Sequence, residues 1–180
     1  MNHNRGYPET VSEGFDPPPL NFVDGEERSI QIRSYAETST EFEAIVNMYD
    51  QFDPADRAQG IPPSQEDRIR DWLANILDGN CLNVVAWHND TVAGHATLVP
   101  DEEAFELAIF VLQAFQQAGI GTQLVNALLG YGAAQDVSKV WLTVERWNHA
   151  AVALYEKVGF EMCETESFEI EMSIRLAADE

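Results

Sequence analysis

Apolar and polar residues alternate with a period of two over residues 28–35, which predicts a first strand. Two stretches of helical periodicity follow, one after the capping residues 38–40 and one starting at Ser64. The apolar positions of these two helical faces are Phe42, Ile45, Val46, Tyr49, Ile69, Trp72, Leu73 and Ile76. The first half of the chain therefore predicts one strand and two amphipathic helices.

The second half returns to strand-like patterns, interrupted twice by helical spacing. The predicted strands cover residues 81–87, 92–99, 105–112 and 137–144, with short strands around Phe160 and over 167–175; the predicted helices start near Gly119 and cover 148–158. The resulting order is β-α-α-β-β-β-α-β-α-β-β. It predicts an α/β fold with a mixed sheet, mainly antiparallel in its first half.

A length of 180 residues suits a single domain. Residues 1–27 contain Pro8, Pro17, Pro18 and Pro19 among glycines and acids, a composition that buries little surface. We therefore predict an acidic N-terminal tail or strap over residues 1–27 and one domain over residues 28–180.

The charge of the chain is strongly negative, because 31 Asp and Glu residues face 10 Lys and Arg residues and give a formal net charge of -21. Such a surface repels phosphate backbones and anionic lipid, so the sequence predicts neither a nucleic-acid nor a membrane partner. Two interpretations of the acidity remain: adaptation to very high salt, which the scarcity of lysine favours, or steering of a cationic substrate.

Other function classes are excluded by smaller features. The two cysteines, Cys81 and Cys163, make no disulfide framework, and no Cys-His spacing typical of a metal site occurs, so we predict no metal. The start of the sequence has no apolar segment of a secretory signal. The uncharged stretch 107–135 holds too many glycines and amides for a membrane span. These features predict a soluble, cytoplasmic protein.

The segment 105–122 predicts an anion site. A strand leads into residues 116–122, here called the glycine turn, and then into a helix whose first N–H groups have no partner within the helix. Residues 107–135 carry no charged side chain, although 23% of the chain is charged. The absence of carboxylates from this stretch is what a polyanionic ligand would require. A buried strand and helix would also lack charge. A phosphate-binding P-loop needs a lysine that is absent here, and a dinucleotide fingerprint needs a glycine at Leu124.

A second group of residues lies in the helix over 148–158. Asn148 is a good N-cap, and Tyr155 follows seven residues later, so the two project from the same side of the helix. Taken singly, they are a cap and a core aromatic.

Together the two segments resemble the GNAT superfamily of acetyl-CoA-dependent N-acetyltransferases. The first family motif, Gln/Arg-x-x-Gly-x-Gly/Ala, is matched by residues 116–121, and the second, Asn-x-x-Ala-x-x-Leu-Tyr-x-Lys-x-Gly-Phe, by residues 148–160. The resemblance covers residues 28–175 in element order and implies a GNAT-like mixed sheet. One departure is Gln117, where many members have glycine.

The resemblance also implies the roles of residues. Pyrophosphate of acetyl-CoA would be held by backbone amides, and the pantetheine arm by the strand end and an asparagine; the implied cofactor-binding residues are Phe110, Val111, Gln116, Gln117, Ala118, Gly119, Ile120, Gly121, Thr122 and Asn148. Tyr155 would be the general acid that protonates the departing thiolate.

The base that deprotonates the amine is not identified by the motifs. Glu106 is our first candidate, with Glu145 and His95 as alternatives. The predicted function is direct acetyl transfer from acetyl-CoA to a primary amine on a small molecule or peptide. A non-catalytic acyl-CoA-binding or regulatory module on the same fold is the alternative, and an interaction protein that binds no coenzyme A is a third. The acidic loop 49–57 is expected to line the acceptor site; the acceptor and the oligomeric state, for which a homodimer is one option, stay open.

Overall fold

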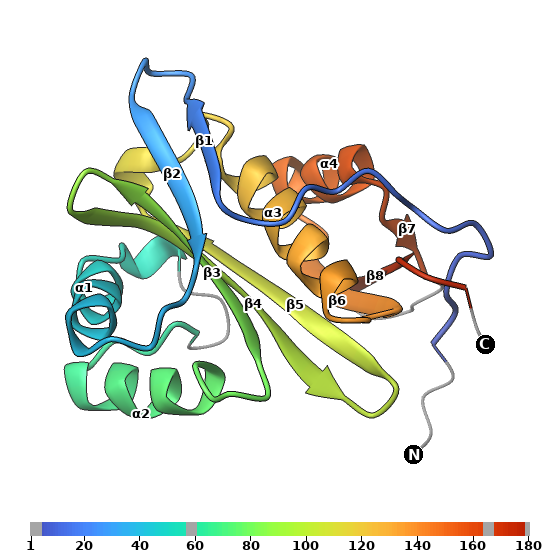
Figure 1. Cartoon of the computed structure of the whole chain (residues 1–180), viewed down its shortest axis with the longest axis horizontal. Helices are drawn as coiled ribbons and strands as arrows, with labels where there is room; N and C mark the ends of the chain where they lie inside the picture. The colour runs from blue at the N-terminus through green and yellow to red at the C-terminus, as the bar shows by residue number, and fades with distance from the viewer. Residues whose placement is uncertain (1–4, 57–60, 164–167, 179–180) are drawn as a thin grey trace.

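A computed structural model describes residues 5–56, 61–163 and 168–178. They form one 8-stranded sheet in the order β1-β2-β3-β4-β5-β6-β8-β7 (Figure 1). The strands are β1 Leu20–Val23, β2 Ser29–Ser34, β3 Leu82–His88, β4 Thr91–Asp101, β5 Ala104–Val111, β6 Lys139–Glu145, β7 Glu161–Met162 and β8 Glu169–Arg175. The α-helices are α1 Ser39–Asp50, α2 Glu66–Ile76, α3 Ile120–Ala134 and α4 His149–Val158, and short 3-10 helices cover Pro54–Asp56 (η1) and Gln113–Phe115 (η2).

Helices cover the two faces of this sheet, which is why neighbouring residues of β4 have different surroundings. His95 contacts Tyr49 of α1, with 5.9 Å between the ring centroids. The preceding residue, Gly94, faces α3, because a Cβ atom there would lie 2.8 Å from Leu124. Successive strand residues point to opposite faces, so a strand covered on both sides is apolar throughout. The core accordingly extends through both layers.

The predicted fold class is confirmed, with element boundaries within a few residues of those expected from the pattern. All strand neighbours pair antiparallel except β5 and β6, which are parallel. The predicted order lacks one element: β1 lies in the segment 1–27 for which we predicted a tail or strap, and it pairs with β2 from Leu20 opposite Ile32 to Val23 opposite Ser29.

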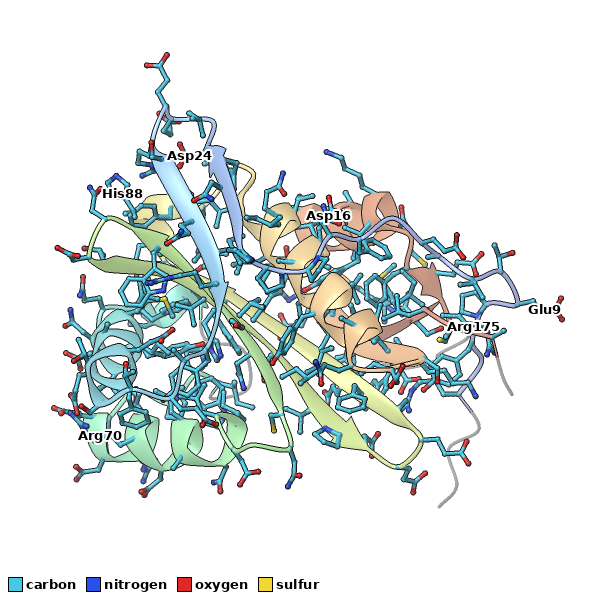
Figure 2. All side chains as sticks on the ribbon, in the orientation of Figure 1. Glu9, Asp16, Asp24, Arg70, His88 and Arg175 are labelled. Carbon is cyan, nitrogen blue, oxygen red and sulfur yellow. The ribbon has the colours of Figure 1, made fainter. Side chains whose placement is uncertain are left out.

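The remainder of the N-terminal segment runs over α3 toward β8 (Figures 1 and 2). The Ser12 N–H donates to the carbonyl of Arg175 at 2.8 Å, and Nε of Arg175 donates to the carbonyl of Pro8 at 2.6 Å. On α3, a Cβ atom at Gly130 would lie 2.5 Å from the carbonyl carbon of Asp16. Glycine is therefore required at position 130 for this close passage of the backbone.

The strands β5 and β6 separate soon after they pair. Their parallel pairing joins Phe105 with Val140 and Glu106 with Trp141. Beyond Glu106, residues 107–111 of β5 continue paired with β4, and β6 continues paired with β8. In an antiparallel pair, alternate residues direct their N–H and C=O groups away from the partner strand. The edge of β5 that faces β6 therefore offers backbone groups that have no strand partner among the described residues where the sheet opens.

Candidate active site

A cavity of about 490 Å³ lies where β5 and β6 separate. Its walls are residues 106–110 of β5, the end of β6, the start of α4 and η1; among them are the predicted site residues Glu106, Phe110, Asn148 and Tyr155. The cavity thus joins residues 106–110 of β5 with Asn148 and Tyr155 of the second motif, whereas residues 116–122 of the glycine turn do not line it. Val111, predicted to bind pantetheine, does not line it.

Tyr155 is buried in the wall of the cavity at 7% exposure, and its ring packs edge to face on Phe160 at 5.8 Å. Burial raises the pKa of its hydroxyl well above the ordinary tyrosine value. The phenol therefore keeps its proton at neutral pH, which is the state that a proton donor needs.

Asn148 is both a helix cap and a residue of the cavity wall. Its side-chain oxygen accepts a hydrogen bond from the Ala151 N–H at 3.2 Å, as an N-cap of α4 should. Because it also lines the cavity, the remaining part of the carboxamide is available to a ligand there.

Three glutamates line the same cavity: Glu106, Glu145 and Glu169. Glu145 of β6 is directly opposite Glu169 of β8 in the strand register. Burial raises the pKa of Glu106, and the charges of Asp101 and Glu169 raise it further, against a lowering by Arg5. Glu169 was not predicted as a site residue; its position depends on the pairing of β6 with β8, which local sequence does not reveal.

The third candidate base, His95, lies outside this cavity. It is fully buried, with Nδ1 2.6 Å from the Tyr49 hydroxyl and Nε2 2.7 Å from Oδ1 of Asn83. Burial lowers its pKa to about 3. Both ring nitrogens are engaged, so His95 is part of the core and is removed from the list of candidate bases.

The glycine turn has the geometry of an anion site. Gly119 is the N-cap of α3 and adopts a left-handed φ of 87°, with open space where a side chain would be. The backbone N–H groups of residues 117–122 have no acceptor within the described part of the chain. They gather at the positive end of the α3 dipole, where an anion is favoured.

Two glutamines shape this turn. Gln116 is exposed, and its side chain donates to the carbonyl of Val111 at 3.0 Å, so it closes the end of β5. Gln117 adopts a left-handed φ of 59°. Glycine adopts this conformation without steric strain, which explains why it suits the position in the family that the sequence resembles. Here Gln117 adopts it with the strain that a Cβ atom causes.

The glycine turn adjoins the cavity through the packing of Gly121. A Cβ atom on Gly121 would lie 3.1 Å from Leu154 of α4 and 3.6 Å from Ile109 of β5. Ile109 lines the cavity, and Leu154 precedes Tyr155. One extended ligand can therefore reach from the turn, along the free edge of β5, to the cavity.

The predicted acceptor loop 49–57 contributes Ala55 and Asp56 to the cavity wall, while Arg57 lies outside the described residues. Ile61 and Trp147, which is 68% exposed, complete this end. These two residues were not predicted as site residues; the only signal in the sequence is the position of Trp147 directly before Asn148 of the second motif.

Within the ranges 5–56, 61–163 and 168–178, no three His, Cys, Asp or Glu side chains are grouped so that they could hold a metal ion. None of the described helices is long and apolar enough to cross a membrane.

Comparison with protein families shows that residues 42–160 match the model of the acetyltransferase (GNAT) family. Among curated proteins, the [ribosomal protein bS18]-alanine N-acetyltransferase of Salmonella typhimurium is 38% identical over 94 residues. That match covers 49% of this chain and 64% of the relative, so it spans less than two thirds of the relative's length.

Solved structures share the fold at low sequence identity. The GNAT domain of S. lividans PAT superimposes with a TM-score of 0.73 at 12% identity, covering 88% of this chain and 97% of that domain. The PaiA N-acetyltransferase of Thermoplasma acidophilum, solved in complex with coenzyme A, gives a TM-score of 0.65 at 16% identity, covering 81% and 98%.

Proposed function

Because the chain belongs to the acetyltransferase (GNAT) family, we propose that it is an N-acetyltransferase that moves an acetyl group from acetyl-CoA to a primary amine. The observation that carries the proposal is the opening of the sheet beyond Glu106, which gives Tyr155 and the free edge of β5 a common cavity beside the glycine turn. Related folds include one solved with coenzyme A.

The residues fit coenzyme A in three places. The N–H groups of residues 117–122 bind its pyrophosphate, the edge of β5 bonds the pantetheine arm as an added strand would, and Asn148 contacts the same arm. The uncharged stretch 107–135 keeps carboxylates away from the phosphates in a chain whose net charge is -21.

Catalysis in this proposal combines proton transfer with positioning. The amine loses one proton before it attacks and a second as the amide forms, while the sulfur gains one. Glu106 accepts the first proton, and Tyr155 donates to the departing sulfur and recovers a proton from the new amide nitrogen. Backbone N–H groups at the edge of β5 polarise the thioester carbonyl.

The acceptor is an amine that arrives as a cation. Glu106, Glu145, Glu169 and Asp56 line the cavity and attract positive charge. The name of one relative specifies an alanine of the ribosomal protein bS18, and we propose a peptide N-terminus first among acceptors, before a lysine side chain or a polyamine. The protein would act in the cytoplasm, where acetyl-CoA is available.

Release of free thiol from acetyl-CoA, measured against peptides with N-terminal alanine, lysine peptides and polyamines, tests this function. We expect turnover with at least one class of cationic amine. Coenzyme A binding in calorimetry without turnover on any acceptor would favour the alternative, a non-catalytic acyl-CoA-binding or regulatory module. Absence of binding would reject both.

A further inference from the structure

The β1–β2 connection is a tight turn over residues 24–28, here called the hairpin turn. The Glu27 N–H donates to the carbonyl of Asp24 at 3.1 Å, and the Asp24 N–H donates to the carbonyl of Arg28 at 2.9 Å. Glu27 has a left-handed φ of 62°. A β-turn followed by one left-handed residue is a common hairpin connection, with Gly25 at the second position of the β-turn.

The hairpin turn is held rigid by the side chain of Asp24, which lies at the end of the hairpin in Figure 2 and is 7% exposed. One oxygen accepts from the N–H groups of Glu26 and Arg28 at 3.0 and 2.9 Å, and the other accepts from Nε of Arg28 at 2.7 Å. Burial alone would raise the pKa of Asp24, but these hydrogen bonds and the charge of Arg28 outweigh it and lower the pKa.

This rigid turn contacts the segment that leads into α3. The Gly25 N–H donates to the carbonyl of Ala118 at 2.9 Å, and Nη1 of Arg28 donates to the carbonyl of Ala114 at 3.0 Å. The Arg28 guanidinium also lies 4.4 Å from the ring centroid of Phe115. An element far away in sequence therefore holds two carbonyl groups next to the proposed pyrophosphate site.

The orientation of one peptide group links this contact to anion binding. In a planar trans peptide, C=O and N–H point in opposite directions, so holding the Ala118 carbonyl toward Gly25 directs the Gly119 N–H away from the hairpin. Gln117 and Gly119, on both sides of this carbonyl, have left-handed φ angles of 59° and 87°. Glycine allows such a peptide to rotate, and the Gly25 hydrogen bond opposes the rotation.

We propose that the hairpin turn is a positioning element for the pyrophosphate site: Gly25 and Arg28 hold the glycine turn with its N–H groups directed at the phosphates. This role rests on the proposed binding of coenzyme A at the glycine turn. The two residues touch no reacting atom and act through the orientation of the 118–119 peptide, so their effect is on cosubstrate affinity and not on the chemical step.

Two substitutions weaken this contact in different ways. Arg28→Met keeps a long apolar side chain over Phe115 but removes the donors to Ala114 and Asp24. Gly25→Pro suits the β-turn itself, but it replaces the N–H donor by a ring carbon directed at the Ala118 carbonyl, now 2.9 Å from the nitrogen, so the glycine turn must move away. The matched control is Arg33→Met on β2, which removes the same charge from another arginine that lies over an aromatic ring, 4.8 Å from the ring centroid of Trp87.

The readout compares acetyl-CoA with S-acetylpantetheine, which lacks the pyrophosphate, on the full chain. Both variants should raise the Kd for coenzyme A by about tenfold, the effect of roughly one lost hydrogen bond, and leave kcat/KM for S-acetylpantetheine within about twofold of the parent. Arg33→Met should change neither value.

The outcomes separate this inference from the function on which it rests. Unchanged coenzyme A affinity in both variants, or an equal loss with both cosubstrates, would overturn the positioning role and leave the hairpin as structural support. If Gly25→Pro does not fold, Arg28→Met decides. A parent protein that binds no coenzyme A would reject the proposed function itself.

Discussion

The hydroxyl of Tyr49 lies 2.6 Å from Nδ1 of His95, and both side chains are fully buried. The other ring nitrogen of His95 is 2.7 Å from Oδ1 of Asn83, whose Nδ2 donates to the carbonyl of Ile76 at 2.8 Å. Since Asn83 uses its amide hydrogens on Ile76, its oxygen accepts from Nε2 of His95, and Nδ1 accepts from Tyr49. This network joins α1 and the end of α2 to the middle of the sheet.

We expect His95→Gln to destabilise the fold without abolishing catalysis. The free energy of unfolding should fall by about 1–3 kcal/mol, because Tyr49 and Asn83 lose a buried partner. Urea unfolding and kcat on the same preparation measure both effects. A kcat lowered a thousandfold with normal stability would return His95 to the mechanism.

The same variant should change how stability depends on pH. Burial lowers the pKa of His95 to about 3 in the folded protein, below the ordinary value near 6.5. Between these two pH values His95 is protonated in the unfolded chain but not in the folded protein. The free energy of unfolding of the parent therefore falls by up to about 1.4 kcal/mol per pH unit as pH decreases through this window. The free energy of unfolding, measured at several pH values from 7 to 4, should therefore fall less steeply with decreasing pH for His95→Gln than for the parent.

His95 also illustrates a limit of sequence-based prediction. β4 is apolar on both faces because helices cover both, so alternation does not tell which of its residues face the cavity. The side of the sheet that receives His95 depends on where α1 packs. A histidine on the strand that pairs with β5 could therefore be proposed as a base from sequence and still belong to the core.

Tyr155 and Asn148 were predictable, because one helix carries both and the spacing of seven residues fixes their common side. Glu169 and β1 were not. Glu169 enters the site through strand pairing with Glu145, and β1 forms because β2 offers a free edge to residues 20–23. Both depend on contacts between distant segments, whereas periodicity and capping report local structure.

Tyr155→Phe should lower kcat by about ten- to a thousandfold, because it removes the proton donor and keeps the ring. Burial holds the pKa of this hydroxyl well above the ordinary value, so no loss of the proton competes with its role near neutral pH. Coenzyme A affinity and the packing on Phe160 should be retained. The matched control is Tyr131→Phe on α3, a half-buried tyrosine outside the cavity, and equal kcat values for the two variants would remove Tyr155 from the mechanism.

Glu106→Gln tests the base through its pH dependence. The pKa of Glu106 is raised by burial, so kcat/KM in the parent should fall as pH drops through a value above that of an ordinary glutamate. In the variant, kcat/KM should be about 10²–10⁴ lower and should no longer show this acidic limb of the pH profile. Glu145→Gln, on the opposite wall, should keep the limb; if instead Glu145→Gln removes it, the two roles are exchanged.

Glu106→Gln should also stabilise the protein at neutral pH. A folded-state pKa above the unfolded one means that Glu106 favours the fold when protonated, and that this contribution is lost as pH rises through the folded pKa. The neutral side-chain amide of the Glu106→Gln variant does not ionise, so the variant does not lose this stability as pH rises. Higher urea resistance at pH 7, together with little difference at pH 3, is the expected result.

The net charge of -21 predicts a response to salt. If the acidity is an adaptation to high salt, the Tm should rise by many degrees between low and molar KCl, where the Debye length shrinks to about 3 Å and repulsion among carboxylates is screened. If it steers a cationic amine, the Tm should stay flat while kcat/KM for the amine falls with salt. Calorimetry and initial rates over one KCl series distinguish the two.

Gln117→Glu tests the glycine turn as an anion site. Gln117 is exposed and already left-handed, with φ of 59°, so a glutamate of the same size adds charge without new backbone strain. A carboxylate near the N-terminus of α3 should leave the fold as stable or slightly more stable. It should nevertheless raise the Kd for coenzyme A by roughly five- to tenfold at low salt, and less in molar KCl.

The choice of Gln117 avoids a difficulty at Gly119, where valine would be strained at φ of 87° whatever the ligand. The matched control is Gln65→Glu, since Gln65 is an exposed N-cap residue of α2 with no side-chain capping bond. It makes the same amide-to-carboxylate change beside another helix N-terminus, and the net charge of both variants is equal. If the two substitutions weaken coenzyme A binding equally, the effect is the net charge of the protein and the phosphates bind elsewhere; a loss confined to Gln117→Glu assigns them to the start of α3.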